Sequence, residues 1–329
     1  MNCSVNMHQP LAFCVGNIIH DIVMGRIYDY GDTEFAYFKK LIDSTLEQVQ
    51  SVSLLVADSF PFLAPFMPAY YKYRRNGQAL QDFFLHEIDK HEKALRDEAY
   101  TGPPRDFIEA YLQEMEKKPD SPYLSKFTLA LNSGDLWTGG METTVTTIRW
   151  GIIYLIHYPD VQEAMFDELD EVLGSERVTY ADRTQLPYTC ATIAELQRLA
   201  NVLPWNIPHM TTRTACAGGF MLPAGTDVMA HLGAVHHDPD LYEDPDDFQP
   251  ERFLLPDGSF SPGPYFAPFS LGKRSCLGEH LARVELLLIF ATLVQHFEFR
   301  AAGTQPSLER RMGMTSVPYE YKCTIVPRK

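Results

Sequence analysis

The sequence has no paired-cysteine motif, no long uninterrupted apolar run and no internal repeat. Its cysteines number six in 329 residues. None forms a C-x-x-C pair, which argues against a zinc site and against a disulfide scaffold. The apolar run from Leu11 to Ile19 ends in His20 and Asp21. It is shorter than a membrane span and lacks a basic stretch and a cleavage site, so we expect neither an anchor nor a signal peptide in it.

Positive charge is also scarce. Lys and Arg number 28 against 43 Asp and Glu, which gives a net charge of −15. A protein that binds nucleic acid needs a basic face for the phosphates, so the composition argues against a nucleic-acid partner. It leaves room for a local basic patch that faces an electron donor. The apolar content of 45% is enough to bury a sizeable core.

The pattern of apolar residues predicts a mainly α protein with a minor β part near the C-terminus. Residues 1–100 are expected to be helical, apart from an aromatic, proline-containing segment Phe60–Tyr71 that cannot form a regular helix. Short strands are expected within 204–250 and over Lys322–Val326. Further helices are predicted at these ranges: 73–99, 124–157, 160–173, 190–201 and 279–297.

Cys276 is the residue whose surroundings carry most chemical information. It lies in the segment Phe269–Gly278, with Arg274 two residues before it and a predicted helix N-terminus just after it. Positive charge and the helix dipole both stabilise a thiolate, and a thiolate is a strong iron ligand. The flanking Gly272 and Gly278 leave space for a flat cofactor. A glycine-flanked cysteine by itself would equally fit a buried structural thiol.

Two further segments have a distinctive composition. Glu195 and Arg198 are three residues apart and share one helix face, upstream of Arg252. A pair of this kind is usually a surface ion pair of little energetic value. The run 139–144, Gly-Gly-Met-Glu-Thr-Thr, lies within the long predicted helix. It fits either a glycine-weakened helix or a site where a threonine hydroxyl opens the helical ladder.

Together these three segments resemble the cytochrome P450 monooxygenases, in particular the animal microsomal, family 2-like branch. The resemblance runs from about residue 11 to the C-terminus and implies the mainly α cytochrome P450 fold. We expect residues 1–329 to form a single cytochrome P450 domain that corresponds to the C-terminal two-thirds of the usual family chain, from about its fourth helix. The N-terminal third and the membrane anchor of that chain have no counterpart, so the fold is expected to be N-terminally truncated.

The resemblance also implies roles for individual residues. Cys276 would bind the iron of haem b, held in a loop with Phe269, Gly272 and Gly278. A buried structural triad of Glu195, Arg198 and Arg252 would lock that loop. Thr143 and Glu142 would deliver protons to dioxygen, beside the space left by Gly139 and Gly140. The haem propionates would meet Arg274, Arg213 and His209, although His209 fits an ordinary loop histidine equally well. Residues expected to line the substrate pocket, each of which also fits plain core, are Leu136, Trp137, Val202, Leu203, Trp205, Met314 and Thr315.

The implied reaction inserts one atom of dioxygen into an apolar small molecule. Electrons would come from NADPH through a flavoprotein reductase, with cytochrome b5 as a second donor, at the cytosolic face of the endoplasmic reticulum membrane. One alternative is a truncated, non-catalytic fragment of such an enzyme that only binds haem or does nothing. Another is a haem-thiolate isomerase that needs no dioxygen, against which Thr143 and Glu142 argue.

Overall fold

The computed structural model describes residues 3–49, 51–98, 102–311 and 315–328. They form two compact units. The first, called here the N-terminal unit, comprises Gln9–Glu142. The second, the C-terminal unit, comprises Met1–His8 and Thr143–Lys329. Each unit is described by itself, and helix α6 (Lys126–His157) contributes residues to both.

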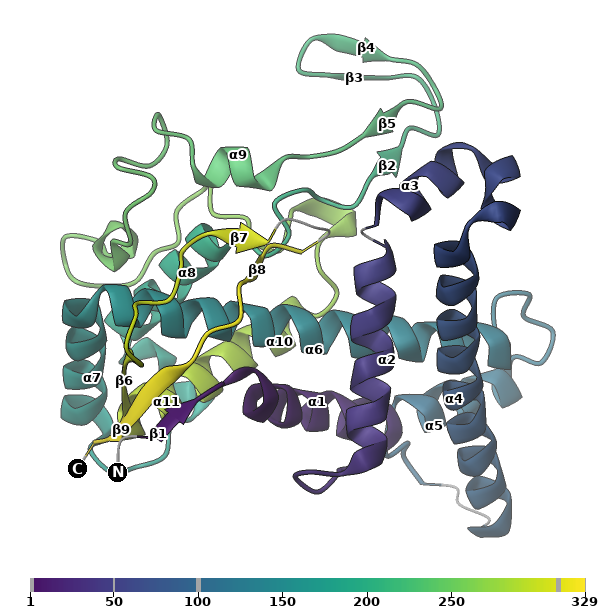
Figure 1. Ribbon diagram of the computed structural model, residues 1–329, viewed down its shortest axis with the longest axis horizontal. Coiled ribbons are helices and arrows are strands. Elements are labelled where there is room, and N and C mark those ends of the chain that lie inside the picture. The colour runs from purple at the N-terminus through teal and green to yellow at the C-terminus, as the bar shows by residue number, and fades with distance from the viewer. Residues whose placement is uncertain (1–2, 50, 99–101, 312–314, 329) are drawn as a thin grey trace. The chain divides into compact units, whose positions relative to one another are not determined.

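The N-terminal unit is helical. Helix α2 (Thr33–Val49) packs along α4 (Pro68–Glu98), and the two lie side by side in Figure 1. An aromatic core holds the unit together, in which the ring of Phe38 lies 4.3 Å from that of Phe83 and 4.7 Å from that of Trp137. The remaining helices of this unit are α1 (His8–Met24), α3 (Val52–Ser59), the 3-10 helix η1 (Pro61–Phe66) and α5 (Phe107–Lys117).

The C-terminal unit combines helices with small antiparallel sheets. Its three-stranded sheet has the order β1-β9-β6, formed by Cys3–Val5, Cys323–Pro327 and Phe297–Ala301. The prediction of a mainly α protein with a minor β part is confirmed. The two-stranded pairs are β2 with β5 (His209–Met210, Asp227–Val228), β3 with β4 (Ala215–Ala217, Phe220–Leu222) and β7 with β8 (Arg310–Arg311, Val317–Pro318).

The helices of the C-terminal unit follow the predicted ranges with shifted ends. Helix α8 begins at Pro187 rather than at residue 190, and α4 of the N-terminal unit begins at Pro68, because proline fits the first helical turn. The expectation that Phe60–Tyr71 is not α-helical was therefore wrong for its last four residues. The other helices and 3-10 turns of this unit are α7 (Pro159–Leu173), η2 (Tyr180–Thr184), α9 (Leu232–His236), η3 (Pro250–Phe253) and η4 (Gly272–Arg274).

The helix predicted at 279–297 is interrupted in the middle. Helix α10 (Glu279–Glu285) passes into a π-helical turn η5 (Leu286–Phe290) and then into α11 (Ala291–His296). A π-turn carries an extra residue, which rotates the side chains beyond it relative to those before it. No helix among the described residues is long and apolar enough to cross a bilayer.

A small apolar cluster supports the segment that leads to Cys276. Ala191 and Ala194 on α8 pack against Tyr242, Phe253 and Phe266. Burial of these side chains stabilises the irregular segment after α9, in which η3 is the one helical turn among the described residues. The cluster ends at Phe266, three residues before the loop that carries the cysteine.

Candidate functional site

Cys276 lies in a tight loop held by backbone hydrogen bonds. The backbone N–H of Cys276 donates to the carbonyl of Phe269 (2.9 Å), and that of Ser270 donates to Ala267 (3.0 Å). Ser270 and Gly272 have φ of 62° and 82°, in the left-handed region that lets the chain turn back sharply. The loop presents the thiol of Cys276 as an exposed, unbridged group just before α10.

The surroundings of the thiol fit a flat, largely apolar cofactor. A Cβ built on Gly272 or Gly278 would meet no atom within 4 Å, so both glycines border open space. Leu271 and Leu277 are 75% and 88% exposed, so apolar side chains that an apolar ligand could cover flank the thiol. Among the described residues, no group of three or more His, Cys, Asp or Glu is placed to hold a metal ion. The Cys276 thiol is thus a single exposed sulfur donor beside open space.

Glu195, Arg198 and Arg252 meet in one buried ion network. Arg198 Nε and Nη2 donate to the two carboxylate oxygens of Glu195 at 2.7 and 2.8 Å. Arg252 Nε donates to Glu195 Oε1 at 3.0 Å. Glu195 and Arg198 are fully buried, so their charges are stable only because each is paired and hydrogen-bonded.

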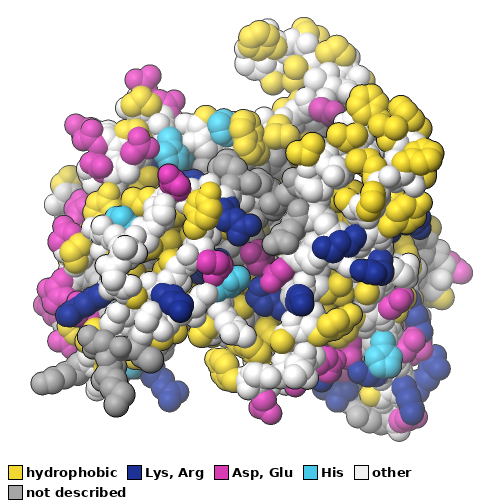
Figure 2. All heavy atoms as spheres, viewed as in Figure 1, with side chains coloured by type: hydrophobic (Ala, Val, Ile, Leu, Met, Phe, Trp, Pro, Cys, Tyr) yellow, Lys and Arg dark blue, Asp and Glu magenta, His cyan; other side chains and the backbone are white. Residues whose placement is uncertain are grey.

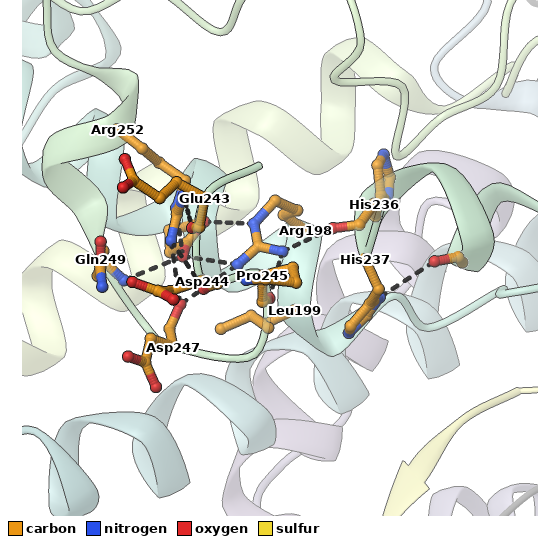
Figure 3. Close-up of polar contacts among 12 residues, drawn as sticks. Arg198, Leu199, His236, His237, Glu243, Asp244, Pro245, Asp247, Gln249 and Arg252 are labelled. Atoms are coloured by element: carbon orange, nitrogen blue, oxygen red, sulfur yellow. Dashed lines mark hydrogen bonds and ion pairs between the residues drawn. The ribbon is translucent and has the colours of Figure 1, made fainter. Parts of the chain in front are cut away.

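Backbone carbonyls complete this network, as Figure 3 shows. Arg198 Nη1 donates to the carbonyls of His236 (2.6 Å) and Pro245 (2.7 Å). Arg252 Nη1 donates to the carbonyl of Glu243 (2.8 Å). The two guanidinium groups thus hold the irregular segment between α9 and η3 in place, because these carbonyls have no helix or strand to satisfy them.

His236 extends the network towards the cysteine loop. Its Nε2 accepts a hydrogen bond from the backbone N–H of Ala267 (3.2 Å), the residue that also accepts from Ser270. Nε2 is therefore unprotonated and the ring neutral. Burial, followed by the nearby Arg198 and His237, lowers the pKa of His236 to about 4. The sequence did not identify His236 as a site residue.

The part of α6 that belongs to the C-terminal unit begins with four threonines: Thr143, Thr144, Thr146 and Thr147. Thr147 Oγ1 donates to the carbonyl of Thr143 (2.8 Å), a bond that competes with the helical ladder at that position. Thr144 Oγ1 donates to Glu285 Oε2 on α10 (3.2 Å). The side chains of Glu142 and Thr143 are half-buried. Thr143, from which we expect hydroxyl chemistry, therefore lies on a face of α6 that carries further threonine hydroxyls.

Gly139 and Gly140 lie in the N-terminal unit and differ in their surroundings. A Cβ on Gly139 would meet no atom within 4 Å, whereas one on Gly140 would lie 2.7 Å from Ile19 Cδ1. Gly139 thus borders open space, as a site for a small ligand requires, and Gly140 allows close packing of α6 on α1. Helix α6 continues through both glycines without a break.

The three residues expected at the propionates lie on separate segments of the C-terminal unit. Arg274 follows the turn at Gly272, His209 begins β2, and Arg213 lies between β2 and β3. Arg274 and Arg213 are exposed, and His209 is half-buried. Within the described residues, none of the three side chains makes a hydrogen bond or ion pair, so their donors are available to an anionic ligand.

The residues expected to line the substrate pocket have varied surroundings. Trp137 is fully buried in the aromatic core of the N-terminal unit, where its Nε1 donates to His20 Nδ1 (2.6 Å). Trp205 is 46% exposed, and its ring stacks on that of His231 with the ring centroids 3.8 Å apart. The half-buried members of the set are Leu136, Val202, Leu203 and Thr315, and Met314 lies outside the described residues.

Comparison with known proteins completes this description. The family model described as Cytochrome P450 matches residues 2–325. The chain is 38% identical over 327 residues to Cytochrome P450 2J5 of Mus musculus, covering 98% of this chain and 64% of that protein. It is 38% identical to Cytochrome P450 2J2 of Homo sapiens, again covering 98% and 64%. It is also 38% identical to a 3-ketosteroid oxygenase of Caenorhabditis elegans, covering 95% and 54%. The chain thus spans between about half and two-thirds of the length of these relatives.

Proposed function

The chain belongs to the cytochrome P450 family, and from that premise we propose that it forms the haem-thiolate part of a monooxygenase that inserts one atom of dioxygen into an apolar small molecule. The observation that carries the proposal is the loop of Cys276, which presents an exposed thiol beside open space at two glycines. The relative in Caenorhabditis elegans is named a 3-ketosteroid oxygenase, which supports an apolar substrate.

Haem is the cofactor of this family, and the residues present fit it. Cys276 would bind the iron, and Phe269, Gly272 and Gly278 would shape the loop around the ring. Arg274, Arg213 and His209 would bind the propionates, since their side-chain donors have no partner among the described residues. When bound, the haem supplies the oxygen chemistry, which a thiolate ligand favours by pushing electron density onto the iron.

The protein's own contribution is to hold and move protons and to keep the loop rigid. Thr143 and Glu142 would manage protons on the distal side, next to the open space at Gly139. The network of Glu195, Arg198 and Arg252 would act structurally, through the backbone carbonyls that it binds. Because the network would contact neither the substrate nor the reacting atoms, its loss should first appear as weaker binding of the cofactor.

The substrate pocket would be lined from the loop that follows α8 and from the C-terminal tail. A hydrogen bond from the backbone N–H of Ser316 to the carbonyl of Val202 (2.8 Å) joins these two segments. Leu203, Trp205 and Thr315 flank this bond in the sequence and would contact substrate. Leu136, Trp137 and Met314 remain part of the proposed lining.

The electrons would come from NADPH through a flavoprotein reductase, with cytochrome b5 as a second donor. Lys273 is exposed beside the cysteine loop and offers positive charge to an acidic docking face. The same proposal places the protein at the cytosolic face of the endoplasmic reticulum. An exposed apolar surface in the N-terminal unit, visible over α3 and η1 in Figure 2, would contact the membrane there: Phe60, Phe62, Leu63 and Phe66 are 52%, 71%, 36% and 82% exposed.

Labelled dioxygen tests the proposed reaction directly. The chain is loaded with haem, supplied with reductase and NADPH, and given a panel of apolar compounds, including 3-ketosteroids. One labelled oxygen atom is expected in the product, and none should appear when unlabelled dioxygen is used. Turnover without incorporation of the label would exclude a monooxygenase.

A further inference from the structure

Arg310 caps the C-terminal end of α8. It lies on β7, where its Nη1 donates to the carbonyl of Ala200 (2.8 Å) and its Nη2 donates to the carbonyl of Leu199. The last carbonyls of a helix have no partner within the helix, so another group has to bind them. A further end carbonyl, that of Gln197, accepts from the backbone N–H of Asn201. The charge of Arg310 also lies at the negative end of the helix dipole, which strengthens the cap.

The same guanidinium group lies over the ring of Trp150. Its Cζ is 5.3 Å from the centroid of that ring, within the range of a cation–π interaction. Trp150 lies on α6 and is fully buried. Its Nε1 donates to the carbonyl of Ser316 (3.0 Å), and Arg310 Nη1 donates to Ser316 Oγ (3.4 Å). Arg310 therefore contacts three separate segments of the C-terminal unit: the end of α8, the C-terminal part of α6 and the tail at Ser316.

Ser316 joins these contacts to the loop that follows α8. Its backbone N–H donates to the carbonyl of Val202 (2.8 Å), two residues beyond Ala200. Ser316 is itself fully buried. The end of α8, the loop that begins at Val202 and the tail at Ser316 thus form one bonded assembly around Arg310 and Trp150, called here the Arg310 cluster. The loop and the tail are the two segments proposed to line the substrate pocket.

Arginine suits this position better than another cation would. No carboxylate pairs with Arg310 among the described residues, so neutral carbonyls, a hydroxyl and an aromatic ring surround its charge. A planar guanidinium presents several N–H donors in fixed directions and can bind two successive carbonyls at once, whereas a lysine ammonium is a single point of charge. The next residue, Arg311, is exposed and makes no hydrogen bond or ion pair within the described part of the chain.

We propose that Arg310 is a positioning residue for substrate, which fixes the loop after α8 relative to the C-terminal tail and so determines which position of an apolar molecule is oxidised. This inference rests on the proposed function. Leu203 and Trp205 follow Val202 on the loop, and Thr315 precedes Ser316 on the tail. A shift of one segment against the other moves these side chains, and small displacements of positioning groups have large effects on a reaction. Arg310 acts through them and not by contact with the substrate.

Hydrogen exchange of single backbone amides tests the Arg310 cluster in the protein as it is purified. Arg310→Met keeps the length of the side chain but removes its charge and all its donors. We expect the amide of Ser316 to exchange about tenfold faster or more in this variant, because hydrogen bonds to charged groups stabilise more than neutral ones. The amide of Tyr188, at the other end of α8, donates to Glu168 Oε1 (2.7 Å) and should keep its rate. Arg311→Met is the matched control and should leave both rates unchanged.

Arg310→Lys separates the charge from the planar donors. It should slow the exchange of Ser316 relative to Arg310→Met, without reaching the wild-type rate. Equal rates for Ser316 in the wild type and Arg310→Met would overturn the inference. So would a rise at Tyr188 in the same proportion as at Ser316, because Arg310 would then stabilise the C-terminal unit as a whole rather than join two of its segments.

A second arm tests the effect on the reaction. The haem-loaded protein with reductase and NADPH is given progesterone, a 3-ketosteroid with several oxidisable positions, and then the rest of the panel of apolar compounds. In Arg310→Met the ratio of the products should change severalfold and KM should rise, and in Arg311→Met neither should change. A variant that only contains less folded protein would form less of every product, with the same ratio and the same KM.

Identical product ratios and KM in the wild type and Arg310→Met would contradict the inference even if the exchange rates are as expected. If neither protein oxidises any compound of the panel, the proposed function fails. The exchange rates then still decide whether Arg310 joins the two segments, so the two failures are distinguishable.

Discussion

The imidazole of His236 accepts a hydrogen bond from the backbone N–H of Ala267, nine residues before Cys276. The carbonyl of the same histidine accepts one from Arg198. One residue thus connects the buried ion network of α8 to the segment that enters the cysteine loop. Rigidity of the loop depends on this connection, because the loop itself has only a few short backbone bonds.

Breaking the buried network should be far more costly than breaking a surface pair. Glu195→Gln removes the negative charge shared by Arg198 and Arg252, and we expect it to lower the free energy of unfolding by about 3–5 kcal/mol. Urea denaturation of the haem-free protein measures this loss. The control is Glu298→Gln, whose partner Arg300 is exposed, and its effect should be about 1 kcal/mol or less. Equal effects of the two substitutions would show that the network is not structural.

Two buried histidines should make the protein sensitive to acid. Burial lowers the pKa values of His20 and His236 to about 4, from 6.5. Between about pH 6.5 and 4 the unfolded chain binds protons that the folded chain does not, so the free energy of unfolding falls as the pH is lowered through this window. The loss is about 3 kcal/mol per histidine at most. Urea denaturation at a series of pH values measures it, and above pH 6.5 these two groups should have no effect.

The variant His236→Asn isolates one of these contributions. Its free energy of unfolding should depend less steeply on pH between about 6.5 and 4 than that of the wild type. A pH dependence that is identical in the wild type and His236→Asn would contradict the assignment of His236 as a neutral buried group.

Sequence reasoning found the parts of the site that depend on short spacing. Glu195 and Arg198 share a helix face, and Arg252 could be added through the family resemblance. The carbonyls that these arginines bind could not be predicted, because they lie on an irregular segment whose path is set by tertiary contacts such as the packing of Phe253 and Phe266 on α8. The hydrogen bond between His236 and Ala267 depends on the same path.

The hydrogen bond between Thr144 and Glu285 was missed for a different reason. Glu285 interrupts an apolar stretch of the sequence, and a charged residue there is a signal of burial. A regular helix over 279–297 was predicted, however, and the π-turn at Leu286–Phe290 changes which face each side chain occupies. Trp137 and His20 could not be paired from the sequence either, because 117 positions separate them.

Loss of the Thr143 hydroxyl should affect oxygen chemistry more than binding. In the haem-loaded protein with reductase, Thr143→Ala is expected to divert electrons to peroxide or water and to lower product per electron by about tenfold or more. Peroxide and product are measured together with NADPH consumption. Thr146→Val is the control, because Thr146 is a buried threonine on the same helix whose hydroxyl has no partner among the described residues, and it should couple as the wild type does. Unchanged coupling in Thr143→Ala would remove Thr143 from proton delivery.

We further propose that the two compact units unfold together as one cytochrome P450 domain. Helix α6 runs without a break across the boundary between Glu142 and Thr143, so melting of one unit should fray the helix that serves the other. Calorimetry should then show a single transition whose calorimetric and van't Hoff enthalpies agree. Two resolved transitions would mean that the units are separate domains.

The central claim is that the Cys276 thiolate is the ligand of a haem iron. The most direct measurement is the absorption spectrum of the haem-loaded protein after reduction and addition of carbon monoxide. The wild type should give the red-shifted band of a thiolate-bound haem, Cys276→Ala should lose it, and Cys216→Ala, which removes another exposed free thiol, should keep it. A red-shifted band that persists in Cys276→Ala, or that never appears in the wild type, would contradict the account.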